Sequence, residues 1–151
     1  MAGLKLRAAD AEDLAVISAI LQDALVTVGE MVYLPEESRF VLVANRFRWE
    51  RRPGETPKNA ERTLSGLCID GVTGVRRRGF SPREEERILS LLAIQPESLE
   101  PSPDKPAALI LEFAGGSSIR LEVRRLLCHL DDLGEPWPTR WRPKHPVAES
   151  D

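Results

Sequence analysis

Apolar and polar residues alternate along much of the chain, and this alternation predicts β-strands. Between residues 119 and 123, three apolar side chains alternate with Arg120 and Glu122, which is typical of a strand with one buried face. Comparable runs, rich in β-branched and aromatic residues, predict further strands at residues 4–6, 25–34, 39–49, 63–69, 72–77, 88–94 and 107–113. Most of the chain is therefore expected to form a sheet.

A helical spacing of apolar residues appears twice. Leu14, Ile17, Leu21 and Ala24 follow one another at intervals of three and four residues, and Asp10 precedes them as an N-cap, so a helix is predicted over residues 11–23. Near the other end, the spacing of Leu126, Leu130 and Leu133 before Gly134 predicts a second helix.

Short connections between the predicted strands indicate hairpins. Residues 35–38 join the strands 25–34 and 39–49, and Gly29 suggests a β-bulge in the first of them. The dipeptide Asp70-Gly71 is a typical two-residue hairpin turn, and residues 114–118 connect two further strands. Hairpins place neighbouring strands antiparallel, so a mainly antiparallel sheet is expected.

These elements predict an α+β fold, with a strongly bent sheet or small barrel and one helix near each end. A pleckstrin-homology-like arrangement is the favoured architecture. Residues 1–134 are predicted to form one α+β domain. The Pro-rich tail, residues 135–151, is expected to pack on that domain or to extend from it, and residues 50–60 are expected to form a loop.

The composition fits a soluble, single-domain protein of the cytoplasm. A length of 151 residues suits one domain, and 42% hydrophobic residues suffice for a core. The first residues lack the apolar region of a signal peptide, and no apolar run is long enough to span a membrane, so no membrane association is expected. Two cysteines are too few for a secreted disulfide scaffold.

The sequence offers little catalytic chemistry. His129 and His145 are the only histidines and neither lies in a ligand-spaced cluster, so no metal site and no cofactor are predicted. Cys128 lies among apolar residues that blunt a nucleophile, and residues 113–118 lack the lysine of a phosphate-binding loop. The carboxylate runs 84–86 and 131–132 read as solvated charges. A non-catalytic protein is therefore favoured, and an enzyme remains an alternative.

Positive charge is concentrated in the middle of the chain. Residues 39–87 hold 12 Lys and Arg against 7 Asp and Glu, a net charge of +5, whereas the whole chain carries −3. Arg76, Arg77 and Arg78 follow one strand, and Arg46 and Trp49 belong to another. Strand alternation places Arg46 and Trp49 on opposite faces, which disfavours a surface that stacks bases between arginines.

Several short motifs, in order, resemble a bacterial family known as domain of unknown function 2948. They are 45–50, 89–94, Phe113-Ala114-Gly115-Gly116, 119–123 and Asp132-Leu133-Gly134, followed by Trp137, Pro143 and His145. The resemblance covers most of the chain, but the segment 68–75 departs from it and lacks an expected aromatic residue. It implies a soluble, cytoplasmic protein, mainly of alphaproteobacteria, and no particular activity.

Three functional hypotheses follow. The leading one is a non-catalytic protein-binding or adaptor domain, in which Trp137 and Trp141 of the tail anchor a protein partner. The second is weak binding of nucleic acid or another polyanion by residues 39–87. The third is a small-ligand site or enzyme assembled from Arg46, Arg120 and His145. Homo-oligomerisation through a strand edge is compatible with all three.

Overall fold

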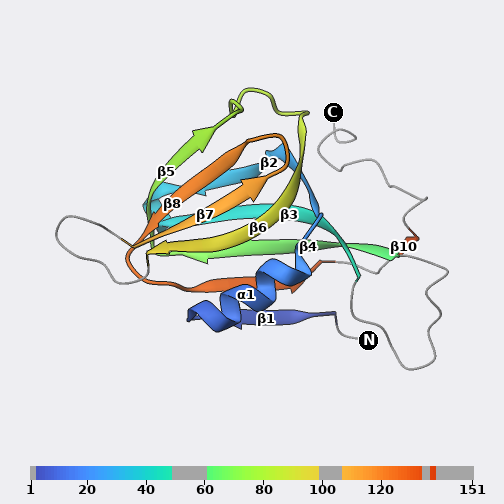
Figure 1. Cartoon of the computed structure of the whole chain (residues 1–151), viewed down its shortest axis with the longest axis horizontal. Coiled ribbons are helices and arrows are strands. Elements are labelled where there is room, and N and C mark those ends of the chain that lie inside the picture. The colour runs from blue at the N-terminus through green and yellow to red at the C-terminus, as the bar shows by residue number, and fades with distance from the viewer. Residues whose placement is uncertain (1–2, 49–60, 99–106, 134–136, 139–151) are drawn as a thin grey trace.

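The computed structural model describes residues 3–48, 61–98, 107–133 and 137–138, and Figure 1 shows them as a curled sheet with one helix. The ten strands are β1 (Lys5–Ala8), β2 (Leu25–Leu34), β3 (Arg39–Phe47), β4 (Glu61–Asp70), β5 (Val72–Arg78), β6 (Ile88–Ser98), β7 (Ala107–Phe113), β8 (Ser118–Val123), β9 (Cys128–Asp132) and β10 (Trp137–Pro138). The helix is α1 (Ala11–Ile20), and a short 3-10 turn, η1 (Pro35–Glu37), joins β2 to β3.

Nine of the strands form one continuous path in the order β1-β9-β4-β3-β2-β6-β7-β8-β5, and β10 pairs with β4 beside this path. Every pairing is antiparallel, as predicted. The path is open, since β1 and β5 are its two ends, so the predicted alternative of a small barrel is wrong. The predicted α+β fold class is wrong, because the described residues contain one α-helix and are otherwise mainly β.

The second helix, predicted around residues 124–133, is absent from the described chain. Cys128–Asp132 forms strand β9 instead, paired with β1 on one side and β4 on the other. Cys128 and Leu130 are buried while His129 and Asp131 are half-exposed, which is the two-residue period of a strand. The pleckstrin-homology-like arrangement, which needs a helix near the C-terminal end, is wrong for the same reason.

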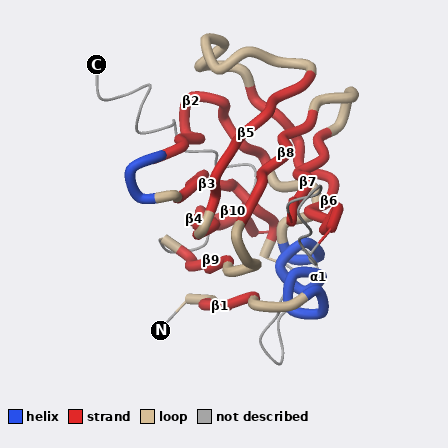
Figure 2. The backbone as a smooth tube through the Cα atoms, turned by 90° about the vertical axis from the view of Figure 1, so that its left-hand side faces the viewer, coloured by secondary structure: helices blue, strands red, loops and turns tan. Residues whose placement is uncertain are grey.

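The dipeptide Asp70-Gly71 forms a corner and not the predicted hairpin. β4 pairs with β3 and β9, whereas β5 pairs with β8 at the far end of the path. Gly71 has a φ of +74°, and its carbonyl accepts a hydrogen bond from the Arg124 N–H in the connection between β8 and β9. β4–β5 and β8–β9 therefore bend side by side, which carries both chains from one half of the sheet to the other (Figure 2).

The first helix begins at the predicted residue, but it ends at Ile20, three residues before its predicted end. Asp10 caps α1 by accepting a hydrogen bond from the Asp13 N–H through its side chain, at 2.8 Å. Leu14 and Ile17 are buried, and the Ser18 hydroxyl accepts a hydrogen bond from the Ile94 N–H of β6. The helix consequently lies between β6 and β1 and covers an end of the core (Figure 1).

The core lies between the two halves of the curled sheet. The β2–β3 hairpin forms as predicted, with its register shift between Val26 and Met31 around Gly29. Inward side chains of β3 and β4 meet those of β7 and β8, and the fully buried ones include Phe40, Leu42, Leu67, Ile69, Leu109, Leu111, Ile119 and Leu121. Burial of this apolar surface is the main stabilising contribution to the fold.

Two predicted segments fall largely outside the described residues. These are the loop 50–60 and the tail 135–151, of which the structure gives only the pairing of Trp137–Pro138 with β4. Within the described part of the chain, none of the helical structure is long and apolar enough to cross a membrane.

Candidate functional site

A shallow groove of about 530 Å³ lies on the outer side of the half-sheet formed by β6, β7, β8 and β5. Its walls come from all four of these strands and from the turn between β7 and β8. The lining residues are Arg76, Arg77, Arg78, Glu97, Ile110, Glu112, Phe113, Gly116, Ser117, Ser118 and Arg120. The groove therefore brings together four of the arginines singled out in the sequence.

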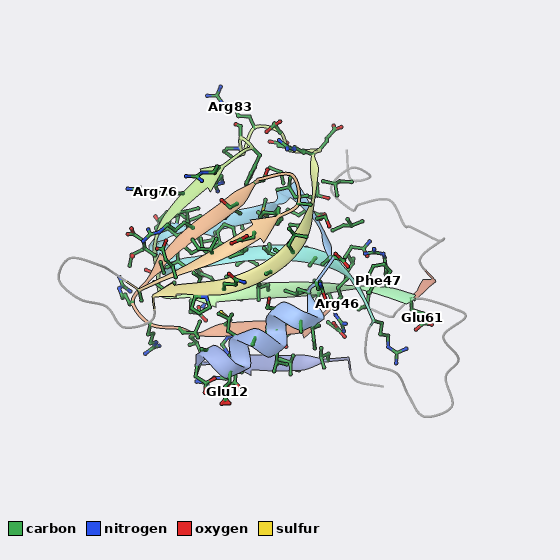
Figure 3. The ribbon with its side chains drawn as sticks, in the orientation of Figure 1. Glu12, Arg46, Phe47, Glu61, Arg76 and Arg83 are labelled. Carbon is green, nitrogen blue, oxygen red and sulfur yellow. The ribbon has the colours of Figure 1, made fainter. Side chains whose placement is uncertain are left out.

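The pairing of β5 with β8 explains why these arginines meet. Arg76 lies directly opposite Arg120, and Arg78 lies opposite Ser118. Side chains opposite one another on antiparallel strands have Cβ atoms roughly 4.5–5.5 Å apart, and like charges at such a pair destabilise the sheet. Figure 3 shows Arg76 projecting away from the body of the molecule. The sequence reading placed both arginines among the candidates but did not predict that they face each other.

Only one member of this arginine pair is neutralised. Arg120 donates from Nε to Glu97 at 2.7 Å and from Nη1 to Glu122 at 2.8 Å. These hydrogen bonds, first that to Glu122, hold the pKa of Arg120 above its ordinary value. In contrast, no side-chain hydrogen bond or ion pair engages Arg76 among the described residues, and the same holds for Arg77 and Arg78.

The end of β5 is held in place by close packing against the β7–β8 turn. Gly79 has a φ of +84°, and a Cβ there would lie 2.8 Å from the Ser117 Oγ. The Gly79 carbonyl accepts hydrogen bonds from the Ser117 hydroxyl and from Arg87 Nη1. Phe80 packs edge-to-face on Phe113, with ring centroids 6.4 Å apart. The arginines are thus displayed from a fixed strand.

The groove has the chemistry of an anion-binding surface. Four arginines and two glutamates, Glu97 and Glu112, line it, so it carries net positive charge. Arginine forks suit carboxylate and phosphate groups, and the hydroxyl of Ser118 lies opposite Arg78. Phe113, the one aromatic residue in the lining of this groove, is buried, so the groove itself offers no exposed ring on which a base could stack.

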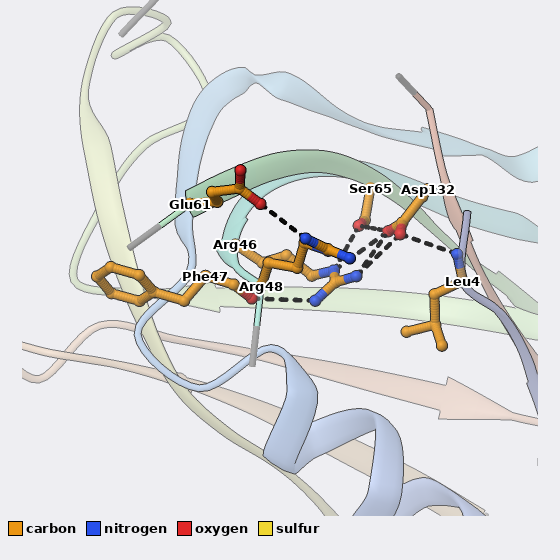
Figure 4. A network of polar contacts seen from close by, with 7 residues as sticks. All are labelled: Leu4, Arg46, Phe47, Arg48, Glu61, Ser65 and Asp132. Carbon is orange, nitrogen blue, oxygen red and sulfur yellow. Dashed lines mark hydrogen bonds and ion pairs between the residues drawn. The ribbon is translucent and has the colours of Figure 1, made fainter. Parts of the chain in front are cut away.

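Arg46 belongs to a different part of the protein. Its side chain is fully buried and pairs with Asp132 through Nη2 at 2.9 and 3.0 Å (Figure 4). Arg46 also donates to the Ser65 hydroxyl and to the Phe47 carbonyl, while Asp132 accepts from the Leu4 N–H. This network joins β3, β4, β9 and the segment before β1. Arg46 is consequently inaccessible to an external partner.

The pKa of Asp132 reflects this setting. Burial by itself raises the pKa of a carboxyl group. Hydrogen bonds from Arg46, Ser65 and the Leu4 N–H outweigh that effect, so the pKa of Asp132 lies below its ordinary value. The sequence reading assigned Asp131 and Asp132 together to solvated charges and missed this role, because only the β4–β9 pairing brings Asp132 to Ser65.

Two further arginines of the predicted basic segment, Arg48 and Arg62, are also engaged within the fold. Arg48 forms an ion pair with Glu61 at 2.7 Å. Arg62 is buried, donates to the Asn45 carbonyl and lies over the Phe47 ring, 3.8 Å from its centroid. Part of the positive charge described within residues 39–87 is therefore taken up inside the fold, and the groove arginines are a separate part of it.

Four candidates that the sequence suggested lie wholly or partly outside the described residues. Trp49, Trp141 and His145 are among them, and Trp137 is described only through the backbone pairing of β10. The proposed cluster of Arg46, Arg120 and His145 has two described members, and these belong to separate ion-pair networks. Arg120 lines the groove whereas Arg46 does not.

A second polar cluster, missed in the sequence, lies on the outer face of β4 and β9. Cys68 is directly opposite His129, and His129 Nδ1 lies 3.6 Å from an Asp70 carboxylate oxygen. Asp70 in turn accepts from Arg39 Nε at 2.9 Å. Burial, and next the charge of Asp70, raise the pKa of the Cys68 thiol, which is the opposite of what a nucleophile requires.

The other cysteine is equally unsuited to chemistry. Cys128 is buried, and desolvation raises the pKa of its thiol to about 12. Both cysteines are free thiols. Among the described residues there is no group of three or more His, Cys, Asp or Glu side chains arranged to hold a metal ion.

The fold and groove together define a small, mainly β domain that displays arginines on one open half-sheet. The chain belongs to the family described as protein of unknown function (DUF2948), whose profile matches residues 4–145. No curated protein and no solved structure matches the chain significantly. The resemblance to this family noted in the sequence is thereby confirmed. Because the family has no described function, the function of this protein has to be argued from the groove.

Proposed function

We propose that this protein is a non-catalytic, cytoplasmic binding domain whose groove binds an acidic segment of a protein partner. The observation that carries the proposal is the Arg76–Arg120 pair, in which Arg76 has no carboxylate partner in the described chain. A like-charge pair costs stability, and because Arg120 already pairs with Glu97 and Glu122, an anionic ligand bound to Arg76 offsets that cost. The free thiols of Cys68 and Cys128 suit a reducing compartment.

A protein segment fits this groove better than a nucleic acid does. Glu97 and Glu112 repel a continuous phosphate backbone, whereas a peptide can direct carboxylates to the arginines and keep neutral residues near the glutamates. Ile110 is half-buried and adds an apolar contact that a peptide side chain can use. The groove also lacks an exposed aromatic stacking surface within the described residues.

The test is a binding titration with a fluorescent peptide of alternating glutamate and threonine. Its isosteric control replaces each glutamate by glutamine, and a single-stranded oligonucleotide serves as the competing ligand class. The protein variants are Arg76→Glu with Arg78→Glu, and the charge-matched control Arg7→Glu with Arg83→Glu, whose exposed arginines lie outside the groove.

Selective binding of the glutamate peptide is expected, and the groove variant should lose about a hundredfold or more in affinity, because each lost charge-assisted hydrogen bond contributes roughly 1.5–3 kcal/mol. The control variant should lose much less. Affinity should also fall with added salt. Equal binding of the glutamate and glutamine peptides would overturn the proposal, and tighter binding of the oligonucleotide would assign the groove to nucleic acid.

A further inference from the structure

The strand that displays the free arginines is also an end of the sheet. β5 pairs with β8 on one side and is the last strand of the path. At its start, the Val72 N–H donates to the Ser38 carbonyl and the Val72 carbonyl accepts from the Tyr33 hydroxyl. Beyond that point, among the described residues, no backbone hydrogen bond outside the β5–β8 pairing involves residues 73–78.

An unpaired strand edge presents a row of N–H and C=O groups that another extended chain can pair with. Arg76 and Arg78, two residues apart in this strand, are both exposed, and Thr73 near its start is exposed as well. Figure 2 shows β5 across the face of the molecule turned toward the viewer. The free edge and the free arginines therefore belong to one accessible strand.

We infer that the acidic segment binds by adding to the sheet as a further strand beside β5, an inference that rests on the function proposed above. An added strand would lie about 4.8 Å from β5, on the side away from β8, so its outward side chains would reach Arg76 and Arg78 and not Arg120 or Ile110. The recognised sequence therefore carries acidic residues at alternate positions. Backbone pairing supplies general affinity, and the two arginines select for carboxylates.

A second copy of this protein is a poor occupant of the edge. Two β5 strands paired antiparallel over residues 72–78 would make Arg76 of one copy a diagonal neighbour of Arg76 of the other, on the same face of the sheet. Like charges so placed repel each other, so the arginines discourage self-association while they attract an acidic strand. The other end of the sheet, β1, carries Lys5 and Arg7 and is guarded in a similar way.

The experiment uses backbone N-methylation of the glutamate–threonine peptide, in a length that matches residues 73–78. In an extended strand, alternate residues direct both N–H and C=O to the same edge. One peptide is methylated at its glutamate nitrogens and a second at its threonine nitrogens. The methyl groups of one of these peptides then block the hydrogen bonds to β5, whereas those of the other point away from β5. Both peptides keep every side chain and every charge.

Strand addition predicts that one methylated peptide loses about tenfold or more in affinity, since several of its backbone hydrogen bonds to β5 are lost together. The other methylated peptide should bind as the parent does. Hydrogen exchange should slow at backbone amides within residues 73–78 when the parent peptide binds. If both methylated peptides bind as the parent does, strand addition is wrong and the acidic-groove function stands. Loss of binding by both methylated peptides also overturns strand addition. If the parent peptide itself fails to bind, strand addition and the proposed binding of an acidic segment are both overturned.

Discussion

Arg46 on β3 and Asp132 on β9 form a bidentate ion pair inside the protein, although 86 residues separate them in the chain. The Arg46→Met variant would leave Asp132 as a buried charge without its cation. We expect it to lower the free energy of unfolding by about 3–5 kcal/mol, the usual cost of breaking a buried ion pair. Urea denaturation followed by circular dichroism measures this change.

The control is the double variant Arg46→Met with Asp132→Asn. It removes both charges and keeps an oxygen that can accept from the Leu4 N–H. Part of the lost stability should return in the double variant, because no buried charge is left uncompensated. A single variant that costs less than about 1 kcal/mol would show that the pair does not hold these strands together.

The same pair predicts how stability depends on pH. The pKa of Asp132 in the folded protein lies below its ordinary value, so the folded state favours the ionised carboxylate more than the unfolded state does. Its stabilising contribution is complete above the unfolded pKa of about 3.9 and is lost as the pH falls through the lower, folded pKa.

Asp132→Asn should therefore destabilise the protein at neutral pH and progressively less below about pH 4. The measurement is the free energy of unfolding of the parent and the variant across the acid range, with Asp23→Asn, an exposed carboxylate, as the control. If the difference between parent and variant stays constant down to the lowest pH, Asp132 does not contribute through its charge.

Alanine substitutions at two glycines with the same left-handed backbone distinguish the cost of backbone strain from the cost of a steric clash. Gly79 and Gly115 have φ angles of +84° and +86°, but a Cβ on Gly79 would lie 3.0 Å from the Ser117 Cα, whereas one on Gly115 would meet nothing within 4 Å. Gly115→Ala should cost about 1 kcal/mol for the left-handed backbone alone, and Gly79→Ala roughly 2–4 kcal/mol because the turn must also move.

Thermal unfolding of both variants gives the comparison. Gly79→Ala should in addition weaken binding of the acidic peptide, because Gly79 and Phe80 fix the end of β5 against the β7–β8 turn. Equal destabilisation by the two substitutions would mean that the contact with Ser117 relaxes without cost.

Local patterns in the sequence predicted the local elements. The spacing of Leu14, Ile17 and Leu21 and the cap at Asp10 identified α1, and alternation identified most strands. Both signals depend on residues a few positions apart, and the structure preserves them. The β2–β3 hairpin and its bulge near Gly29 were predicted for the same reason.

The errors arose where pairing over long distances decides the structure. Leu126 and Leu130 fit a helical spacing, yet Leu130 also fits a strand, and the neighbouring β1 and β4 select the strand. Asp70-Gly71 has the sequence of a hairpin, but β4 pairs with β9 and β5 pairs with β8, each 40 or more residues away, which makes it a corner.

The candidate site was predictable in part. The sequence singled out Arg76, Arg77, Arg78 and Arg120 as polar groups, and the strand pairing brings them to one groove. It did not predict that Arg46 is buried, because the partner Asp132 is reached through two strand pairings that no local pattern reveals.

The groove should bind its ligand at the expense of stability, and Arg76→Glu tests this relation directly. The substitution replaces a like-charge pair with Arg120 by an opposite-charge pair, but Glu97 and Glu122 already pair with Arg120, so we expect the free energy of unfolding to rise by at most about 1 kcal/mol while binding of the acidic peptide falls. Arg76→Gln, which removes repulsion without adding attraction, should lie between the parent and Arg76→Glu in stability.

Arg83→Glu is the matched control, because Arg83 is exposed and lies outside the paired strands, so it should change neither stability nor binding appreciably. Raising the salt concentration should reduce the stability gain of Arg76→Glu, since the pair is near the surface and screened. If Arg76 instead served only the fold, Arg76→Glu would destabilise the protein and leave the peptide affinity unchanged. That result would make Arg76 a structural residue and remove the main support for the binding function.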